Sequence, residues 1–191
     1  MKKTFAFLFT LAVACLSSFS AQAQYAKGDI TASAGISFGT IGYNWGYGGG
    51  RGFLPLSVNA EYSISDKFAI GPYLGFYSRR YNYLSNNDWR FRAISFGARG
   101  TLHATGLLND ALDLGMDEEK LDLYATLLLG FETYSWDFGD YTGNLINDDS
   151  GRLILGPVVG VRYFFNPKFG AFFEAGRGAF GYGTLGVSAK F

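Results

Sequence analysis

Hydrophobic and polar residues alternate one by one along most of the chain after residue 29. In residues 29–38, small or polar residues separate five apolar ones, which are Ile30, Ala32, Ala34, Ile36 and Phe38. A strand points successive side chains to opposite faces of a sheet, so this pattern predicts a strand with one apolar and one polar face.

Eight segments show this alternation, and breaks rich in turn residues separate them. Their apolar positions span residues 30–38, 54–64, 70–76, 94–102, 121–131, 153–161, 171–175 and 185–191. An even number of strands of roughly ten residues is typical of bacterial membrane barrels, and an open sheet edge cannot be satisfied in lipid. The sequence therefore predicts an all-β fold, an eight-stranded antiparallel up-and-down transmembrane β-barrel.

Charged residues indicate which face of the predicted strands points inward. Six of them, three of each sign, lie on the polar face: Glu61, Arg99, Glu132, Arg162, Glu174 and Lys190. A narrow interior must pair each charge that it buries, so we expect these side chains to form a lumen charge network, with inward glycines leaving room for them. A soluble lipocalin-like barrel, whose apolar face surrounds a ligand, is the alternative.

The connections between the predicted strands also alternate in character. Segments 41–52, 82–89, 137–150 and 177–183 are polar, aromatic or rich in glycine, whereas 65–67 and 165–168 are short. This alternation is typical of long outer loops and short periplasmic turns, with both termini on the periplasmic side. The connection 103–120 is too long for a simple turn, and we expect a short helix at 107–114.

The N-terminal segment has the features of a cleavable signal peptide. Lys2 and Lys3 precede an apolar stretch at residues 5–16, and Ala21 and Ala23 flank Gln22 in the small-x-small form of a cleavage site. We therefore expect a signal peptide at 1–23 and an outer-membrane β-barrel domain at 24–191. The 16 basic residues balance the 16 acidic ones, which argues against nucleic acid as a partner.

The last residues carry a more specific signal. The chain ends with Gly186, Val187, Ser188, Ala189, Lys190 and Phe191. With the alternation, this ending resembles the small OmpA/OmpX-like outer-membrane β-barrel (porin-like) proteins over essentially the whole mature chain. The resemblance implies an assembly signal at Gly186, Val187, Ala189 and Phe191 that the barrel-assembly machinery reads, although Ala189 is smaller than the residue usual there. It also implies outer-membrane lipids and lipopolysaccharide as partners, and we expect a monomer.

Candidate chemical motifs are few. The spacing of Gly181, Gly183 and Gly186 fits a dinucleotide fingerprint, but no helix follows before the chain ends. Residues 147–149 (Asn-Asp-Asp) lack the full spacing of a calcium loop. His103 is the single histidine, and we expect it at the periplasmic end, away from the outer leaflet where lipid A enzymes built on such barrels place a catalytic histidine. No catalytic, cofactor or metal site is therefore predicted.

These expectations favour a non-catalytic integral outer-membrane protein. Its exposed loops would serve surface binding, adhesion or envelope integrity. The alternatives are a small or gated porin-like channel, a lipid A modifying enzyme and the soluble lipocalin-like ligand-binding barrel.

Overall fold

The computed structural model describes residues 25–40, 51–82, 88–137 and 150–191. Alternation of apolar and polar residues produces strands throughout these ranges. The strands are β1 (Ile30–Thr40), β2 (Arg51–Gly52), β3 (Leu56–Ser63), β4 (Phe68–Asn82), β5 (Asp88–His103), β6 (Leu121–Asp137), β7 (Ser150–Phe164), β8 (Phe169–Gly176) and β9 (Gly181–Lys190). The helix of these ranges is α2 (Thr105–Leu112).

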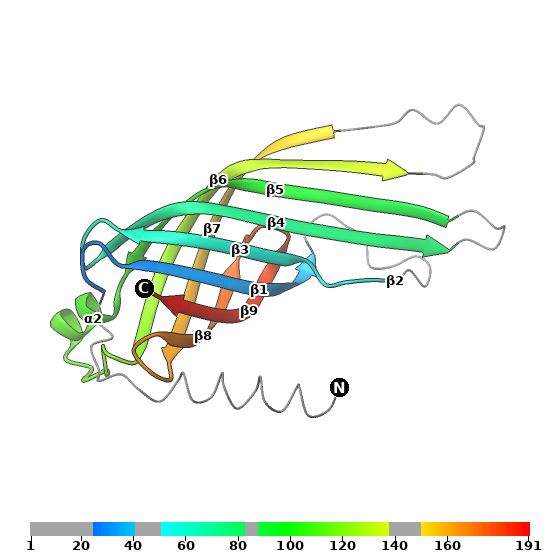
Figure 1. Cartoon of the computed structure of the whole chain (residues 1–191). Coiled ribbons are helices and arrows are strands. Elements are labelled where there is room, and N and C mark those ends of the chain that lie inside the picture. The colour runs from blue at the N-terminus through cyan, green and yellow to red at the C-terminus, as the bar shows by residue number, and fades with distance from the viewer. Residues whose placement is uncertain (1–24, 41–50, 83–87, 138–149) are drawn as a thin grey trace, which may run out of the picture.

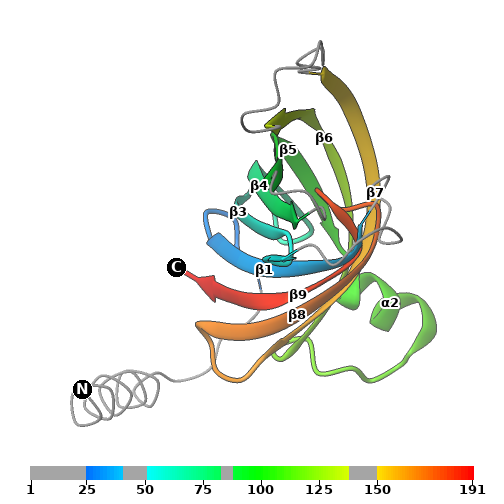
Figure 2. The same cartoon turned by 90° about the vertical axis from the view of Figure 1, so that its right-hand side faces the viewer.

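The long strands form a closed antiparallel barrel in chain order (Figures 1 and 2). β1 pairs with β3 on one side and with β9 on the other, where the register runs from Thr31 opposite Lys190 to Thr40 opposite Gly181. Pairing of β4 with β5 completes the ring. The two residues of β2 pair only with β4, so the eight-stranded barrel predicted from the sequence is confirmed, with β2 as a short addition.

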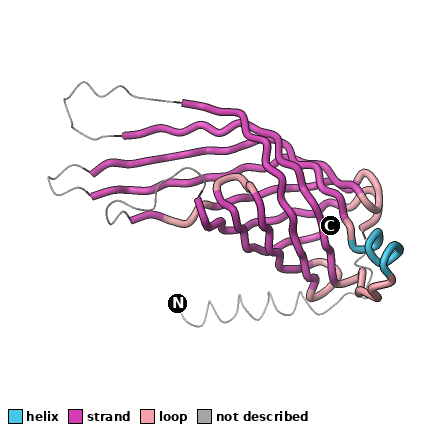
Figure 3. Tube along the Cα trace, turned by 180° about the vertical axis from the view of Figure 1, so that it is seen from behind, coloured by secondary structure: helices cyan, strands magenta, loops and turns pink. Residues whose placement is uncertain are grey.

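The two ends of the barrel differ. One end carries the C-terminus, α2 and the turns at 64–67 and 165–168, and we call it the helix end (Figures 1 and 3). At the opposite end, the loop end, β4 finishes at Asn82 and β5 begins at Asp88. The expected helix in the 103–120 connection is present, although it begins two residues earlier than predicted. Among the described residues, no helix has the length and hydropathy needed to cross a bilayer.

Side chains face as the charge pattern predicts. The apolar positions point out of the barrel, and Leu155 and Val159 remain 59% and 62% exposed. Exposed large apolar residues occur on every long strand, including Ile36, Leu56, Ile70, Phe96, Leu127, Leu155, Phe173 and Val187. Charged residues of the other face are buried inside, so the exterior is a continuous apolar wall.

The connection between β8 and β9 is not the long outer loop that the sequence predicts for 177–183. It has four residues, 177–180, which turn into the barrel, and we call it the inward loop. Ala179 and Phe180 are buried there, and the Arg177 amide donates a hydrogen bond of 2.9 Å to the Pro157 carbonyl. The prediction was wrong because these apolar side chains find partners inside the lumen.

Inward glycines make room mainly for rings and for this loop, rather than for arginine and glutamate as expected. A Cβ at Gly156 would lie 2.1 Å from the Arg177 carbonyl oxygen, and one at Gly75 would lie 2.9 Å from the Phe180 ring. A Cβ at Gly160 would lie 2.3 Å from the Tyr124 ring. The missing side chains therefore permit close packing of aromatic residues in a narrow interior.

Candidate functional site

The helix-end half of the lumen contains a cluster of buried charges. Arg99 on β5 reaches two carboxylates from other strands. Its Nε lies 3.2 Å from Glu61 Oε1 and its Nη2 lies 2.7 Å from Glu174 Oε1. All three side chains are buried, so Arg99 ties β3 and β8 together across the interior.

Arg162 on β7 extends this cluster toward the helix end. Its Nη1 lies 3.1 Å from Asp122 Oδ2, and its Nη2 lies 3.8 Å from Glu61 Oε2. The guanidinium carbon also stands 4.8 Å from the centre of the Tyr124 ring. Glu61 therefore lies between two arginines, and the stacked ring adds a favourable cation–π contact.

Hydroxyl groups donate further hydrogen bonds to two of the carboxylates. Tyr124 donates to Glu174 Oε1 at 3.0 Å, and Thr101 donates to Glu61 Oε1. Thr126 lies 2.8 Å from Thr101 and accepts from Arg99 at 3.2 Å. We define these residues, Glu61, Arg99, Thr101, Asp122, Tyr124, Thr126, Arg162 and Glu174, as the ionic cluster. Such shared partners are needed because a buried charge without hydrogen bonds is costly.

Tyr25, which precedes β1, covers this cluster. Its hydroxyl donates to Asp122 Oδ2 at 2.9 Å and accepts from Arg162. The ring stacks on His103 with 3.8 Å between centroids, and His103 Nδ1 lies 2.9 Å from Asp122 Oδ1. Burial raises the pKa of the Tyr25 phenol above its ordinary value, so the hydroxyl keeps its proton and can act as a donor.

The structure brings four of the six predicted lumen residues together: Glu61, Arg99, Arg162 and Glu174. The other two are also buried but lie apart. Glu132 contacts Arg152 at 2.8 Å, and Lys190 contacts Asp29 at 3.4 Å.

Sequence reasoning missed one charged member of this region, Asp122, the hydroxyl residues Thr101, Tyr124 and Thr126, and Tyr25. Asp122 occupies an inward position of the alternating pattern, so its parity contained the signal. Tyr25 lies outside every strand and carried none.

The loop-end half of the lumen is filled mainly by apolar and aromatic side chains, beside a few buried polar ones such as Ser95 and Glu132, which corrects the expectation of a polar interior. Its buried residues, which we call the aromatic plug, are Tyr73, Tyr77, Phe91, Ala93, Leu128, Ile154, Val158, Ala179 and Phe180. The Tyr77 ring packs 5.8 Å from Phe91 and 6.3 Å from Phe180. Close packing of these rings leaves the upper interior filled by side chains.

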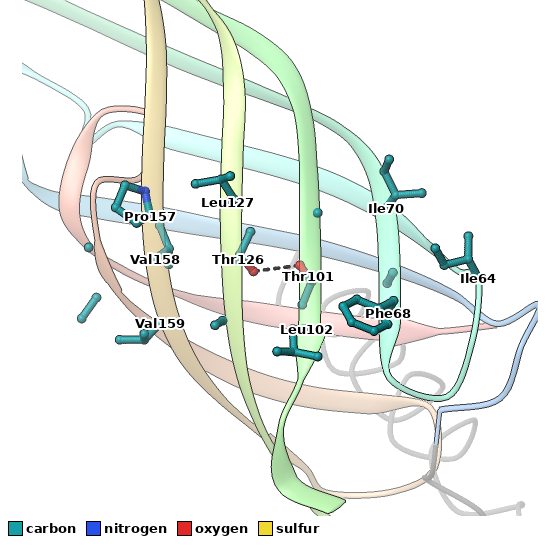
Figure 4. Close-up of a pocket in the computed structure, with 15 residues that line it drawn as sticks. Ile64, Phe68, Ile70, Thr101, Leu102, Thr126, Leu127, Pro157, Val158 and Val159 are labelled. Carbon is teal, nitrogen blue, oxygen red and sulfur yellow. Dashed lines mark hydrogen bonds between the residues drawn. The ribbon is translucent and has the colours of Figure 1, made fainter. Parts of the chain in front are cut away.

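The outer wall carries an apolar groove of about 710 Å³ (Figure 4). Two adjacent rows of outward side chains border it, in the register Phe68–Leu102–Ala125–Val159 and Ile70–Gly100–Leu127–Pro157. Small residues at Gly100 and Ala125 hollow the wall between larger neighbours. The groove matches hydrocarbon rather than a polar substrate, since outward side chains around it are apolar.

The remaining predicted residues lie as follows. Gly186 on β9 stands opposite Gly35, and a Cβ at Gly186 would lie 2.2 Å from the Ala34 carbonyl oxygen. Val187 and Phe191 are exposed on the outer wall, while the role of these residues and Ala189 in assembly stays a prediction. His103 lies at the helix end, and its position on the periplasmic side stays a prediction. Residues 147–149 lie outside the described residues, and no cluster of potential metal ligands occurs in the described ranges.

Comparisons with known proteins identify the fold. No protein-family model matches the sequence, and no curated protein matches it. Among solved structures, Ail, the attachment invasion locus protein of Yersinia pestis, in complex with the heparin analogue sucrose octasulfate, is similar with a TM-score of 0.52 and 15% identity, over 86% of this chain and 99% of that chain. The outer membrane protein OprG of Pseudomonas aeruginosa is similar with a TM-score of 0.50 and 12% identity, over 89% of this chain and 99% of that chain. The chain thus has the eight-stranded fold of small outer-membrane barrels, and the resemblance inferred from the sequence is confirmed at the level of fold.

Proposed function

We propose that this protein is an integral outer-membrane barrel with a non-catalytic binding role at its loop end. The apolar exterior of the closed sheet carries this proposal. Outward residues such as Leu153, Leu155 and Val187 are more than half exposed, and a soluble monomer seldom presents a continuous apolar surface of this extent. In a bilayer the same side chains are covered by lipid.

Cell fractionation with a gel-shift assay tests the location. The mature protein should appear in the outer-membrane fraction and should migrate differently before and after boiling, because a closed barrel resists detergent. A freely soluble periplasmic protein with no heat-dependent shift would contradict the proposal and favour the lipocalin-like alternative.

Side chains fill the lumen, which favours a binding role for the protein over ion conduction. The aromatic plug occupies the loop-end half and the ionic cluster occupies the other half. An eight-stranded barrel has an interior just wide enough for its own side chains. Planar-bilayer recordings should therefore show no steady conductance, whereas defined single-protein conductance steps would support the channel alternative.

The surroundings of His103 do not favour the lipid A enzyme alternative. The ring lies at the helix end, stacked on Tyr25 and bonded to Asp122. Lipid A mass profiles of cells should therefore be the same with the wild type and with His103→Ala. A changed profile would support the enzyme.

Exposed arginines at the loop end suit contact with lipopolysaccharide. Arg80 on β4 and Arg92 on β5 are exposed, and Arg80 stands opposite Arg90 in the register. Arginine binds phosphate through charge-assisted hydrogen bonds. Replacing Arg80 and Arg92 with glutamine should weaken retention of the protein on lipopolysaccharide-containing vesicles. The Lys67→Gln substitution at the helix end should leave this retention unchanged.

A further inference from the structure

A second recess lies at the helix end, between α2, the turn that joins β3 to β4 and the start of β6. It has a volume of about 250 Å³. The residues that give it its character are Asp66, His103, Asp110, Glu118 and Asp122, and we call it the acidic cup. In contrast to the groove on the outer wall, its lining is dominated by charged and polar side chains.

The charges of the acidic cup favour a cation. Four carboxylates line it, and Lys67 is the basic residue of the lining. Asp122 is bound to Arg162 and Tyr25, and Glu118 accepts a hydrogen bond of 2.7 Å from Asn109. Asp66 and Asp110 line the recess and are exposed to solvent, so they can approach a ligand without breaking an ion pair.

His103 gives the cup a buried ring nitrogen without a hydrogen-bond partner. The side chain is 7% exposed, and its Nε2 has no hydrogen-bond partner in the described part of the chain. An aspartate oxygen can only accept, so the bond to Asp122 places a proton on Nδ1. In a neutral ring Nε2 then carries a lone pair, and a buried acceptor of this kind favours an incoming N–H or O–H donor.

From these observations we propose that the acidic cup binds the primary ammonium group of a small ligand that arrives from the helix end. The ammonium would donate to His103 Nε2 and to the carboxylates of Asp66 and Asp110. A recess of this volume holds about eight water molecules at roughly 30 Å³ each, which suits a short alkylamine. The described residues contain no group of three or more His, Cys, Asp or Glu side chains placed for a metal ion, which favours an ammonium group over a directly bound metal.

The single histidine makes this proposal directly testable. Untagged mature protein with isotope-labelled histidine, folded in micelles, gives one set of imidazole resonances. Titration with 1,5-diaminopentane at constant pH and ionic strength should shift them saturably. Pentane-1,5-diol, which is uncharged, and glutarate, which is negatively charged, have the same chain length and should not shift the resonances. A non-saturable shift, or an equal shift with the diol, would overturn the proposal.

Variants test whether the diamine binds in the acidic cup. Asp66→Asn and Asp110→Asn should each weaken diamine binding by about tenfold, the usual effect of losing one charge-assisted hydrogen bond. Asp113→Asn and Glu119→Gln remove carboxylates of the same connection outside the cup and should leave affinity unchanged. Equal affinity in the Asp66→Asn/Asp110→Asn double variant, or equal weakening by the control variants, would show nonspecific attraction only. Either result would leave the loop-end function proposed above untouched.

Discussion

The two halves of the barrel interior are filled by opposite chemistry. The helix-end half holds the ionic cluster, in which two arginines from β5 and β7 bridge three carboxylates from three other strands. The loop-end half holds the aromatic plug, which Phe180 of the inward loop completes. Side chains fill both halves, yet the two halves should respond differently when one side chain is removed.

The difference lies in what remains after a substitution. Removing a charge from the ionic cluster leaves its partners buried and unpaired, which is costly however well the backbone relaxes. Removing a ring from the aromatic plug leaves a cavity, whose cost falls when neighbours move in. The ionic half is therefore expected to be more sensitive to single substitutions.

The largest effect is expected for Arg99→Leu. This change leaves Glu61 and Glu174 without their nearest cation and should lower the free energy of unfolding by about 3–5 kcal/mol. Equilibrium urea unfolding of the mature protein in lipid vesicles, followed by tryptophan fluorescence, measures it. An unchanged unfolding midpoint would remove the distinction between the two halves.

A somewhat smaller loss is expected for Phe180→Ala. The buried ring contacts Tyr77, and its removal should cost about 3 kcal/mol, the low end for such truncations because the inward loop can shift. The same unfolding assay applies, with Phe53→Ala as control, since Phe53 is 87% exposed. A larger loss than that of Arg99→Leu would reverse the ranking of the halves.

The substitution Gly156→Ala tests the packing of the inward loop against β7. The new methyl group would meet the Arg177 carbonyl, so we expect a loss of about 1–3 kcal/mol from overpacking. Gly100→Ala is the matched control, because a Cβ there has no neighbour within 4 Å. Equal unfolding curves for the two variants would show that the loop is not held against β7.

The smallest effect is expected for Arg152→Gln. Arg152 contacts Glu132, but its side chain is 42% exposed, so solvent screening should limit the loss to about 1 kcal/mol or less. Unfolding at low and high salt should show that this loss shrinks as salt rises, whereas the loss for Arg99→Leu persists. A salt-independent effect at Arg152 would place that pair with the buried cluster.

The barrel itself was predictable from the sequence because each long strand has one face toward a uniform apolar medium. That requirement repeats every two residues and needs no knowledge of the partner strand. The inward loop was not predictable in this way. Phe180 is buried by Tyr77 and Phe91 from strands far earlier in the chain, and nothing in residues 177–183 indicates those contacts.

The alternating pattern predicted which charged side chains face the lumen, but not which of them lie together. Parity marks Glu132 and Lys190 as inward, yet their pairing with Arg152 and Asp29 separates them from Arg99. Height along the barrel depends on the register between strands, which the residue types do not specify. Tyr25 joins Asp122 across 97 positions of sequence, so its place could only be found in three dimensions.

The seam between β1 and β9 has a consequence for biogenesis. Strand β1 pairs with β9 on one side, so the ring cannot close before β9 has been synthesised. A product truncated before Gly181 would present two bare backbone edges to hydrocarbon, with no water to satisfy them. A barrel that lacks β9 is therefore expected to be unstable in a bilayer.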